Sequence, residues 1–219
     1  MSGGPAVGVL GGRFDPIHLG HLRVAEEVLR RLDLPRVLLM PCAIAPHKRG
    51  ALLTAGDERL AMIRLAVEGR SGLEASSLEI DRGGVSYTID TLRALRATLG
   101  ASAPVFILGM DALLEIETWH EHLALLREFD LVVVDRPGHD LGRLLSSLPA
   151  EVAARIVPAG TAPLGEGGRI HQLPVEPLSI SSSEILARAA AGEPLDGLVP
   201  AVVARYIQRR GLYRQEVAT

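Results

Sequence analysis

Residues 11–21 read Gly11-Gly12-Arg13-Phe14-Asp15-Pro16-Ile17-His18-Leu19-Gly20-His21, and this stretch decides the fold because of what lies on either side of it. The apolar run Val7–Leu10 predicts a buried β-strand before it. Apolar residues then recur at helical spacing over Leu19–Leu32, so a helix begins where the glycines end. Glycines let the backbone turn closely against a ligand, and the N–H groups and positive dipole end of the helix favour a polyphosphate. The sequence therefore predicts a nucleotide site in which His18 and His21 share one helix face.

Strand-like and helical patterns alternate along the rest of the chain, which is typical of crossover units on a parallel sheet. The expected strands are Val7–Leu10, Val37–Met40, Leu73–Ile80, Val105–Leu108 and Leu131–Val134. The expected helices are Leu19–Leu32, Asp57–Glu68, Thr88–Leu99, His120–Arg127, Ser182–Ala191 and Pro200–Arg210. Together they predict an α/β fold, a Rossmann-like, doubly wound and mostly parallel sheet with helices on both faces. We expect residues 138–168 to form peripheral structure rather than a linker, because they include Leu144, Leu145, Leu148, Val152 and Ile156.

Composition limits the class of protein. With 219 residues, of which 47% are hydrophobic, the chain can close a substantial core and fits a single domain spanning residues 1–219. A net charge of -3 and a pI near 6.2 argue against a general nucleic-acid binder, because such proteins present excess Lys and Arg to phosphates. The lone Cys42 cannot form an internal disulfide, residues 1–12 lack the features of a signal peptide, and every apolar run is too short to span a bilayer. We therefore expect a cytoplasmic protein that binds a small ligand.

Polar clusters follow the expected strands or open expected helices. They are Gly11–His21 after the first strand, Pro41–Lys48 after the second, Gly109–Asp111 after a later one and Ser181–Ser183 before a late helix. Ligands of doubly wound sheets bind beyond the carboxyl ends of the strands, where the strand order reverses. We expect all these clusters to meet at that one edge of the sheet.

With these clusters in this order, the chain resembles the bacterial nicotinate mononucleotide adenylyltransferases, within the nucleotidyltransferase superfamily marked by His-x-Gly-His. The resemblance covers nearly the whole chain. It rests on residues 11–21, Pro46-His47-Lys48, Ser86-Tyr87-Thr88-Ile89-Asp90-Thr91-Leu92, Gly109-Met110-Asp111 with Trp119, and Ile180-Ser181-Ser182-Ser183. It implies transfer of AMP from ATP to nicotinate mononucleotide in NAD biosynthesis, which gives deamido-NAD and pyrophosphate and needs Mg²⁺. The partners that it implies are those two nucleotides, and neither a nucleic acid nor a membrane.

The resemblance also implies roles for individual residues, with catalysis assigned to His18 and His21. ATP binding is assigned to Gly11, Gly12, Arg13, Phe14, His18, Gly20, His21, Gly109, Asp111, Ser181, Ser182 and Ser183. Binding of the second substrate is assigned to His47, Lys48, Tyr87, Thr88, Asp111, Trp119 and Arg136. Structural interpretations stay open for some of them: Ser181 as a helix cap, Asp111 as a turn or cap residue, and Trp119 as a core residue.

The chemistry of such a transfer needs positioning and charge rather than a covalent intermediate. An ionised phosphate attacks the α-phosphorus of ATP, so two anions must be held in line and no general base is required. His18 and His21 suit this task as hydrogen-bond donors, and a polyphosphate would keep an imidazole protonated. We expect Mg²⁺ to arrive bridging the ATP phosphates with several waters retained, and we predict no metal-binding residues.

Departures from the family pattern occur at three positions. Arg13 stands where the family has Ser or Thr, Ala45 where it has a second Pro, and Leu186 where an Arg normally reaches the ATP phosphates. Arg188 cannot replace that Arg, because two residues along a helix correspond to about 200° of rotation. Our hypothesis is that Arg13 restores the missing positive charge at the triphosphate.

Other functions stay open at this point. Another adenylyl- or cytidylyltransferase of the superfamily, such as a phosphopantetheine adenylyltransferase, shares His-x-Gly-His but is shorter and does not account for Tyr87, Thr88 and Trp119. A nucleotide-sensing module without catalysis is favoured by Leu186. A fragment of a class I aminoacyl-tRNA synthetase fits the acidic charge less well. Two further questions stay open: whether the substrate is the acid or the amide, and whether the apolar side of Pro200–Arg210 packs on the body or in a homo-oligomer.

Overall fold

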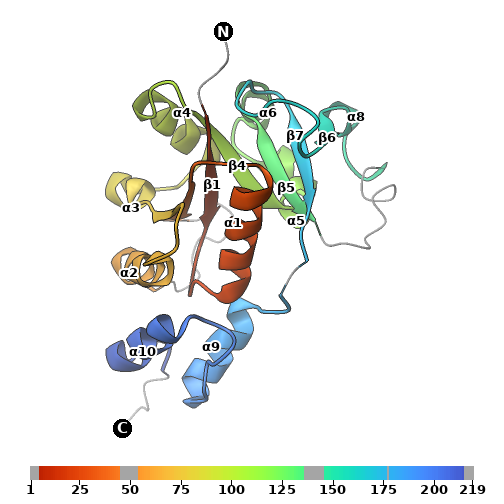
Figure 1. Ribbon diagram of the computed structural model, residues 1–219. Helices are drawn as coiled ribbons and strands as arrows, with labels where there is room; N and C mark the ends of the chain where they lie inside the picture. The colour runs from red at the N-terminus through yellow and green to blue at the C-terminus, as the bar shows by residue number, and fades with distance from the viewer. Residues whose placement is uncertain (1–4, 45–53, 136–145, 177, 215–219) are drawn as a thin grey trace.

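A parallel sheet organises the part of the chain that the structure describes. A computed structural model describes residues 5–44, 54–135, 146–176 and 178–214 (Figure 1). The strands are β1 (Ala6–Gly12), β2 (Val37–Pro41), β3 (Leu73–Ala75), β4 (Ala103–Gly109), β5 (Leu131–Asp135), β6 (Ile156–Pro158) and β7 (Ile170–Pro174). Within the described residues they form one seven-stranded sheet in the order β3-β2-β1-β4-β5-β7-β6, and every neighbouring pair is parallel.

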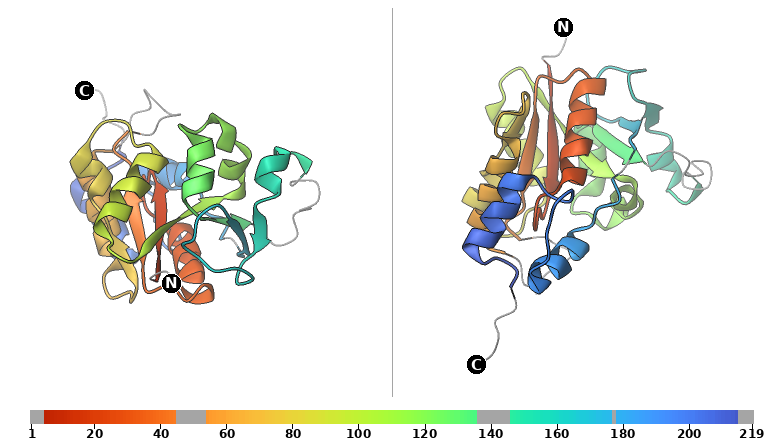
Figure 2. Two further views of the ribbon diagram at one scale, coloured as in Figure 1. Left: turned by 90° about the horizontal axis from the view of Figure 1, so that it is seen from above. Right: turned by 60° about the horizontal axis from the view of Figure 1, so that its bottom comes forward.

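Helices cover both faces of this sheet, as the view from above in Figure 2 shows. They are α1 (Leu19–Arg31), α2 (Gly56–Val67), α3 (Leu78–Arg82), α4 (Thr88–Thr98), α5 (Met110–Leu114), the 3₁₀ helix η2 (Ile116–Thr118), α6 (His122–Glu128), α8 (Ala150–Ala153), α9 (Ser182–Ala191) and α10 (Ala201–Arg210). Each helix predicted from the sequence is present, with its ends displaced by two residues at most. The predicted Rossmann-like α/β fold is therefore confirmed. None of the described helices is long and apolar enough to cross a membrane.

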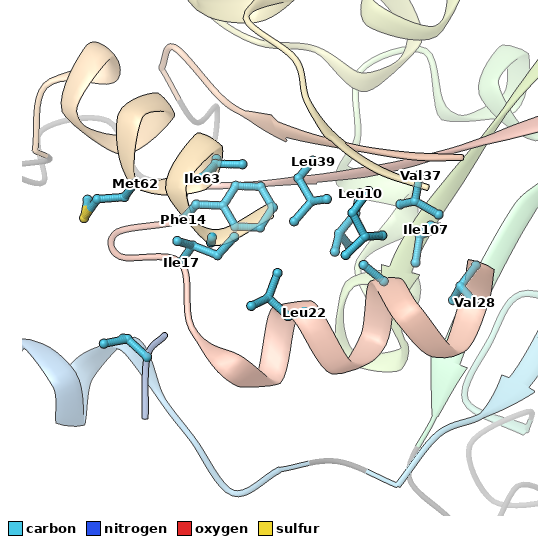
Figure 3. Packing of buried hydrophobic residues seen from close by; sticks show 14 of the residues in the cluster. Leu10, Phe14, Ile17, Leu22, Val28, Val37, Leu39, Met62, Ile63 and Ile107 are labelled. Atoms are coloured by element: carbon cyan, nitrogen blue, oxygen red, sulfur yellow. The ribbon is translucent and has the colours of Figure 1, made fainter. Parts of the chain in front are cut away.

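Alternation along β1 divides the core into two layers. Ala6 and Leu10 belong to a cluster that includes residues of α1, α2, α9 and α10, which we call the α1 core. Val7 and Val9 belong to a second cluster with residues of α4, α5 and α6, which we call the α4 core. Figure 3 shows part of the α1 core, where Phe14 from the turn after β1 lies among side chains of the sheet and of α2. Both faces of the sheet are thus buried, as its nearly continuous apolar strands require.

Strand order reverses between β1 and β4. The chain places β2 and β3 on one side of β1 and then returns to place β4 on the other side. At such a switch point, the connections after the two strands run to opposite faces and leave a crevice beyond the carboxyl ends. The turn after β1 leads into α1 at this end of the sheet, and α9 and α10 lie beyond the same end (Figure 1). The fold therefore brings the early and late parts of the sequence together where a ligand is expected.

The prediction of one strand over Leu73–Ile80 is wrong in its second half. β3 is only three residues long, and the short helix α3 follows it. On α3 the buried carboxylate of Glu79 accepts a hydrogen bond from Thr91 Oγ1 of α4 at 2.6 Å. A buried polar contact between two helices therefore accompanies the change from strand to helix, and apolar periodicity does not register such a contact.

β6 and β7 were not predicted from the sequence. β7 reads Ile-His-Gln-Leu-Pro, which is too polar to indicate a buried strand. His171 in this strand is nevertheless 0% exposed, with its Nε2 atom 3.9 Å from Oδ2 of the buried Asp130. A tertiary contact with a carboxylate thus accompanies the burial of a polar residue in the sheet.

Residues 146–168 are peripheral structure, as expected from their apolar residues. They supply α8 and the edge strand β6. Leu148 and Val152 are buried in the α4 core, whereas Leu144 and Leu145 lie outside the described residues. The stretch is therefore joined to the sheet by its own apolar contacts.

α10 packs on the body of this chain. Val203 is 0% exposed and Ile207 is 3% exposed, and both belong to the α1 core. Tyr206 Oη donates to Oε2 of Glu58 on α2 at 2.8 Å, and Arg210 forms an ion pair with the same carboxylate. Of the two alternatives left open by the sequence for this helix, the structure shows packing on the body.

We expect Ile207→Ala to lower the free energy of unfolding by about 2–5 kcal/mol, because it leaves a cavity where α10 meets the α1 core. Gln208→Ala is the matched control, because Gln208 is exposed on the same helix. Its effect should stay within about 0.5 kcal/mol. Urea unfolding followed by circular dichroism measures both variants. Equal stabilities for the two would contradict the packing of α10 on the core.

Candidate active site

Close packing shapes the end of β1 and the turn that follows it, residues 11–17, which together we call the glycine turn. A Cβ atom on Gly11 would lie 3.0 Å from the ring of Phe106, so only glycine fits without a shift of that ring. Phe14 has a φ of 46° and is buried in the α1 core. Its ring meets the ring of His21 edge-on, with 4.9 Å between the centroids. The turn thereby brings the chain close to the sheet and delivers His18 to the N-cap position of α1.

The two histidines stack on each other at the start of α1. Their ring centroids are 3.6 Å apart with 22° between the ring planes. The backbone N–H of His18 donates to Nδ1 of His21 at 3.3 Å, so a neutral His21 carries its own proton on Nε2. A Cβ atom on Gly20 would lie 3.0 Å from Nδ1 of His18, which explains the glycine between the two rings. The arrangement presents an N–H donor of His21 beside the first turn of a helix.

Burial decides the charge of both rings in the absence of a ligand. It lowers the pKa of His18 to about 4. It lowers the pKa of His21 to about 3, and the neighbouring His18 contributes by charge repulsion. Both imidazoles are therefore neutral at neutral pH. The protonated imidazole expected from the sequence requires the polyphosphate itself, because a nearby anion raises a histidine pKa.

The end of β4 lies beside the end of β1. Leu10 is opposite Ile107 in the register, so Gly12 and Gly109 end adjacent strands. Gly109 is the N-cap of α5, and it has no side-chain cap. Asp111 is exposed in the first turn of that helix. The structure thus brings two of the predicted clusters together at the switch point.

The serine cluster opens α9 close to the start of α1. Ser181 Oγ accepts from the backbone N–H of Glu184 at 3.2 Å, so the predicted capping role of Ser181 is confirmed. The Cβ position of Gly20 is 4.0 Å from the Cβ atom of Ile180, which brings this segment beside the histidines. Ser181 and Ser183 remain exposed. The cap uses only the hydroxyl of Ser181, so it does not prevent the exposed Ser183 from contacting a ligand.

α9 offers no cation at the family's arginine position. Leu186 stands there and is half-buried. The exposed Arg188 forms an ion pair with Glu184 one turn earlier, at 3.0 Å between Nη2 and Oε1. Both observations agree with the expectation that Arg188 does not take over the missing position.

Two pairs of aromatic rings, Phe106 with Trp119 and Tyr87 with His120, form what we call the aromatic group. Trp119 packs against the α4 core, and its ring meets that of Phe106 edge-on, with 6.0 Å between the centroids. Tyr87 is the N-cap of α4, and its ring lies 4.3 Å from the ring of His120. Because the ring of Phe106 also lies next to Gly11, it connects the glycine turn to the aromatic group. His120 was not predicted as a site residue, although its position directly after Trp119 was a usable signal.

Ser86 positions the start of α4. Its Oγ accepts from the backbone N–H of Ala43 at 3.0 Å, and its own N–H donates to the carbonyl of Ile44 at 3.0 Å. The segment after β2 is thereby joined to the residues that precede Thr88. The first turn of α4, which carries Thr88, is held at the same end of the sheet as the glycine turn.

Sequence reasoning missed a buried arginine beneath the site. Arg59 on α2 is 1% exposed and donates to the carbonyls of Arg13 at 2.7 Å, Cys42 at 2.8 Å and Thr54 at 2.8 Å. Its position four residues before Ile63, on the buried face of α2, was the available signal. Arg59 fixes the main chain of the turn that carries the predicted ATP-binding residues.

Asp15 lies inside the motif of residues 11–21, has no role predicted from the sequence, and is 5% exposed. It accepts a hydrogen bond from Tyr213 Oη at 2.7 Å and another from the backbone N–H of Thr54 at 3.2 Å. Nothing in the sequence pattern indicated its pairing with Tyr213, a residue near the far end of the chain. His47, Lys48, Arg136 and the departure at Ala45 lie outside the described residues.

Comparisons with known proteins agree with this arrangement. Residues 9–188 match the family model described as cytidylyltransferase-like. The probable nicotinate-nucleotide adenylyltransferase of Symbiobacterium thermophilum is 43% identical over 207 residues, covering 94% of each chain. The protein of the same name from Pseudomonas syringae pv. tomato is 42% identical over 209 residues, covering 95% of this chain and 93% of the other.

A solved structure adds to the evidence for the fold. The nicotinic acid mononucleotide adenylyltransferase of Plasmodium falciparum, complexed with NaAD, superposes with a TM-score of 0.73 at 19% identity. The match covers 96% of this chain and 98% of that one. At this identity the likeness shows a common fold, whereas the family model and the curated relatives show the family. The chain therefore belongs to the cytidylyltransferase-like family and, within it, to the nicotinate-nucleotide adenylyltransferases.

Proposed function

We propose that this protein transfers the AMP group of ATP to nicotinate mononucleotide and releases pyrophosphate, forming deamido-NAD. The observation that carries the proposal is the stacked pair of His18 and His21 at the start of α1, beside the glycine turn. The names of the curated relatives support it. The phosphate of nicotinate mononucleotide attacks the α-phosphorus of ATP, a new P–O bond forms, and the bond to the β-phosphate oxygen breaks.

ATP is proposed to bind across the ends of β1 and β4, with contacts from the residues assigned above. The first-turn N–H groups of α1 and the Nε2–H of His21 donate to phosphate oxygens. Binding of the polyanion raises the pKa values of both histidines, so that charge-assisted hydrogen bonds form with the ligand in place. The attacking phosphate is already ionised, so the histidines stabilise charge and position the phosphates.

The pyridine ring is proposed to lie against Trp119, near Tyr87. Tyr87 caps α4 without a side-chain hydrogen bond, so the first-turn N–H groups around Thr88 can receive an anion. A nicotinate carboxylate fits this helix start and gains from its dipole, whereas the uncharged amide of nicotinamide does not. His47, Lys48 and Arg136 are proposed to contact the phosphates of the same substrate.

Mg²⁺ is proposed to enter with ATP. Mg²⁺ keeps several waters and is held mainly by substrate phosphates and one or two oxygen ligands of the protein. Among the described residues, no group of three or more His, Cys, Asp or Glu side chains could hold a metal ion, so substrate phosphates and water are proposed to supply most of the ligands. The ion would neutralise phosphate charge and help to orient the leaving pyrophosphate.

Arg13 is proposed to compensate for the absence of an arginine at position 186. Its side chain is 31% exposed, and its Nε atom has no hydrogen-bond partner. Within the described residues its nearest carboxylate is Asp15, at 4.0 Å. A guanidinium held this loosely on the glycine turn suits a triphosphate oxygen.

The first test is an assay of pyrophosphate release with ATP and Mg²⁺. We expect turnover with nicotinate mononucleotide and a kcat/KM about tenfold lower with the amide, because only the acid gains from the dipole of α4. Release with neither substrate would overturn the proposed reaction and favour a nucleotide sensor. Equal efficiency with both would overturn the assignment of the acid to the start of α4.

The donor role of His21 can be tested with substitutions that keep a hydrogen-bond donor near only one of the two ring nitrogens. His21→Gln keeps a donor near the Nε2 position, whereas His21→Asn keeps one only near Nδ1. We expect kcat to fall roughly 10²- to 10³-fold in His21→Asn, as for loss of a preorganised donor, and much less in His21→Gln. Thermal unfolding checks that both variants fold. Equal losses of kcat in the two variants would contradict the role of His21 as a hydrogen-bond donor.

The pH profile of the same reaction tests the charge of the rings. Because the free rings have pKa values of about 4 and about 3 and are proposed to be charged once ATP is bound, binding takes up protons, and kcat/KM should fall as the pH rises from about 6 to 8. A flat profile across this window would mean that the rings stay neutral with ATP bound, and it would contradict the charge-assisted hydrogen bonds.

Arg13→Thr should raise the KM for ATP about tenfold, because a charge-assisted hydrogen bond to phosphate is lost. Leu186→Arg in that background should lower it again. Arg188→Thr is the matched control on α9, since Arg188 pairs with Glu184, and should leave KM within about twofold. Compensation is refuted if Arg13→Thr costs little and Leu186→Arg rescues nothing.

A further inference from the structure

The end of the chain contacts the phosphate-binding turn through Tyr213. Its hydroxyl donates to Oδ1 of Asp15 at 2.7 Å, although 198 positions separate the two residues. Asp15 lies between the glycines and the two histidines, and it is 5% exposed. α10, which precedes Tyr213, lies at the end of the sheet where α1 begins (Figures 1 and 2). A C-terminal residue thus forms a partly buried polar contact with the turn that carries the predicted ATP-binding residues.

Several features hold Tyr213 in this place. α10 is joined to α2 by the bond from Tyr206 to Glu58 and by the ion pair of Arg210 with the same carboxylate. The backbone of Tyr213 has a φ of 65°, which side chains with a Cβ rarely adopt without support from their surroundings. Burial raises the pKa of the Tyr213 hydroxyl, so it remains a donor at neutral pH. The position of Tyr213 beside Asp15 is therefore fixed by the contacts that hold α10 on α2.

The second carboxylate oxygen of Asp15, Oδ2, lies near a backbone N–H and near the guanidinium of Arg13. This Oδ2 atom accepts from the backbone N–H of Thr54 at 3.2 Å and lies 4.0 Å from Nη2 of Arg13. Two neutral donors therefore hydrogen bond to the carboxylate, one on each oxygen. Arg13 stays outside hydrogen-bond distance of it. If the hydroxyl of Tyr213 were absent, a buried carboxylate oxygen would lack its donor, and among the described residues Arg13 is the nearest cation that could supply one.

We infer that Tyr213 is a positioning residue for ATP binding: its hydrogen bond to Asp15 keeps Arg13 available to the triphosphate. The inference rests on the proposed role of Arg13 in ATP binding. Tyr213 itself touches neither substrate. It acts by satisfying Asp15, so that the guanidinium does not close onto that carboxylate.

The test compares Tyr213→Phe with Tyr206→Phe. Each variant removes the hydroxyl of a tyrosine in the C-terminal part of the chain that donates to a carboxylate, but only Tyr213 donates to a residue of the turn that carries Arg13. We expect Tyr213→Phe to raise the KM for ATP roughly 5- to 10-fold with kcat within about twofold. Tyr206→Phe should leave both constants within about twofold. The same pattern is expected in the Kd of an ATP analogue with a methylene bridge between its α- and β-phosphorus atoms, measured by calorimetry.

A double-mutant cycle with Arg13→Thr separates positioning from plain stabilisation. In the Arg13→Thr background, the addition of Tyr213→Phe should change the Kd of the analogue by less than about twofold, because no guanidinium is left to be captured. Additive effects would overturn the inference, since a purely structural contact weakens binding equally in both backgrounds. An unchanged KM and Kd in Tyr213→Phe alone would also overturn it.

Separate control experiments address the folding of the variants and the proposed reaction. Thermal unfolding of every variant sets an assay temperature well below its Tm, and Tyr213→Met serves as a second variant without the donor if Tyr213→Phe proves too unstable. A wild-type protein that binds the analogue but transfers no AMP would refute the proposed reaction while leaving the binding cycle interpretable. A wild-type protein that turns over normally, with Tyr213→Phe unchanged, would refute only the positioning role.

Discussion

The guanidinium of Arg59 joins three pieces of main chain on which the site depends. It donates to the carbonyl of Arg13 after β1, to that of Cys42 after β2, and to that of Thr54 before α2. A cation that is 1% exposed would be costly without partners. Here three carbonyl dipoles surround it, and the fork of an arginine reaches all of them at once. Loss of Arg59 would leave these three carbonyls, which are buried or partly buried, without their arginine donor, in the segments that follow β1 and β2 and precede α2.

The parts of the fold that sequence reasoning predicted are those whose signal is local. β1, β2, β4 and β5 are apolar runs, and the six predicted helices carry apolar residues at helical spacing. The failures occur where polar residues are buried by distant partners. His171 lies in β7 beside Asp130, and Glu79 lies on α3 beside Thr91. A pattern that counts apolar residues interprets such positions as exposed, because their partners are 41 and 12 positions away, respectively.

In the candidate site, too, local sequence signals were predictable and contacts between distant residues were not. Its contiguous parts were predictable, because the glycines, the histidines and the serines each lie within one turn of chain. In the structure Gly12 and Gly109 end adjacent strands, and Gly20 lies beside Ile180, as expected for clusters at one edge of the sheet. The polar contacts that support this edge were not predictable. Tyr213 and Arg59 lie far from the motif in sequence, and a single tyrosine or arginine carries no spacing that would identify its acceptor.

The distribution of charge in the site follows from these supports. Burial keeps His18 and His21 neutral, so their positive charge develops only when a polyphosphate offsets the cost of burying it. Arg13 adds permanent positive charge at a position that water still reaches, because its side chain is 31% exposed. A carboxylate inside the same turn would cancel that charge if it paired closely with Arg13. Hydrogen bonds to Asp15 from neutral donors avoid this loss, and they explain how one short turn can hold an acidic side chain and still favour an anionic ligand.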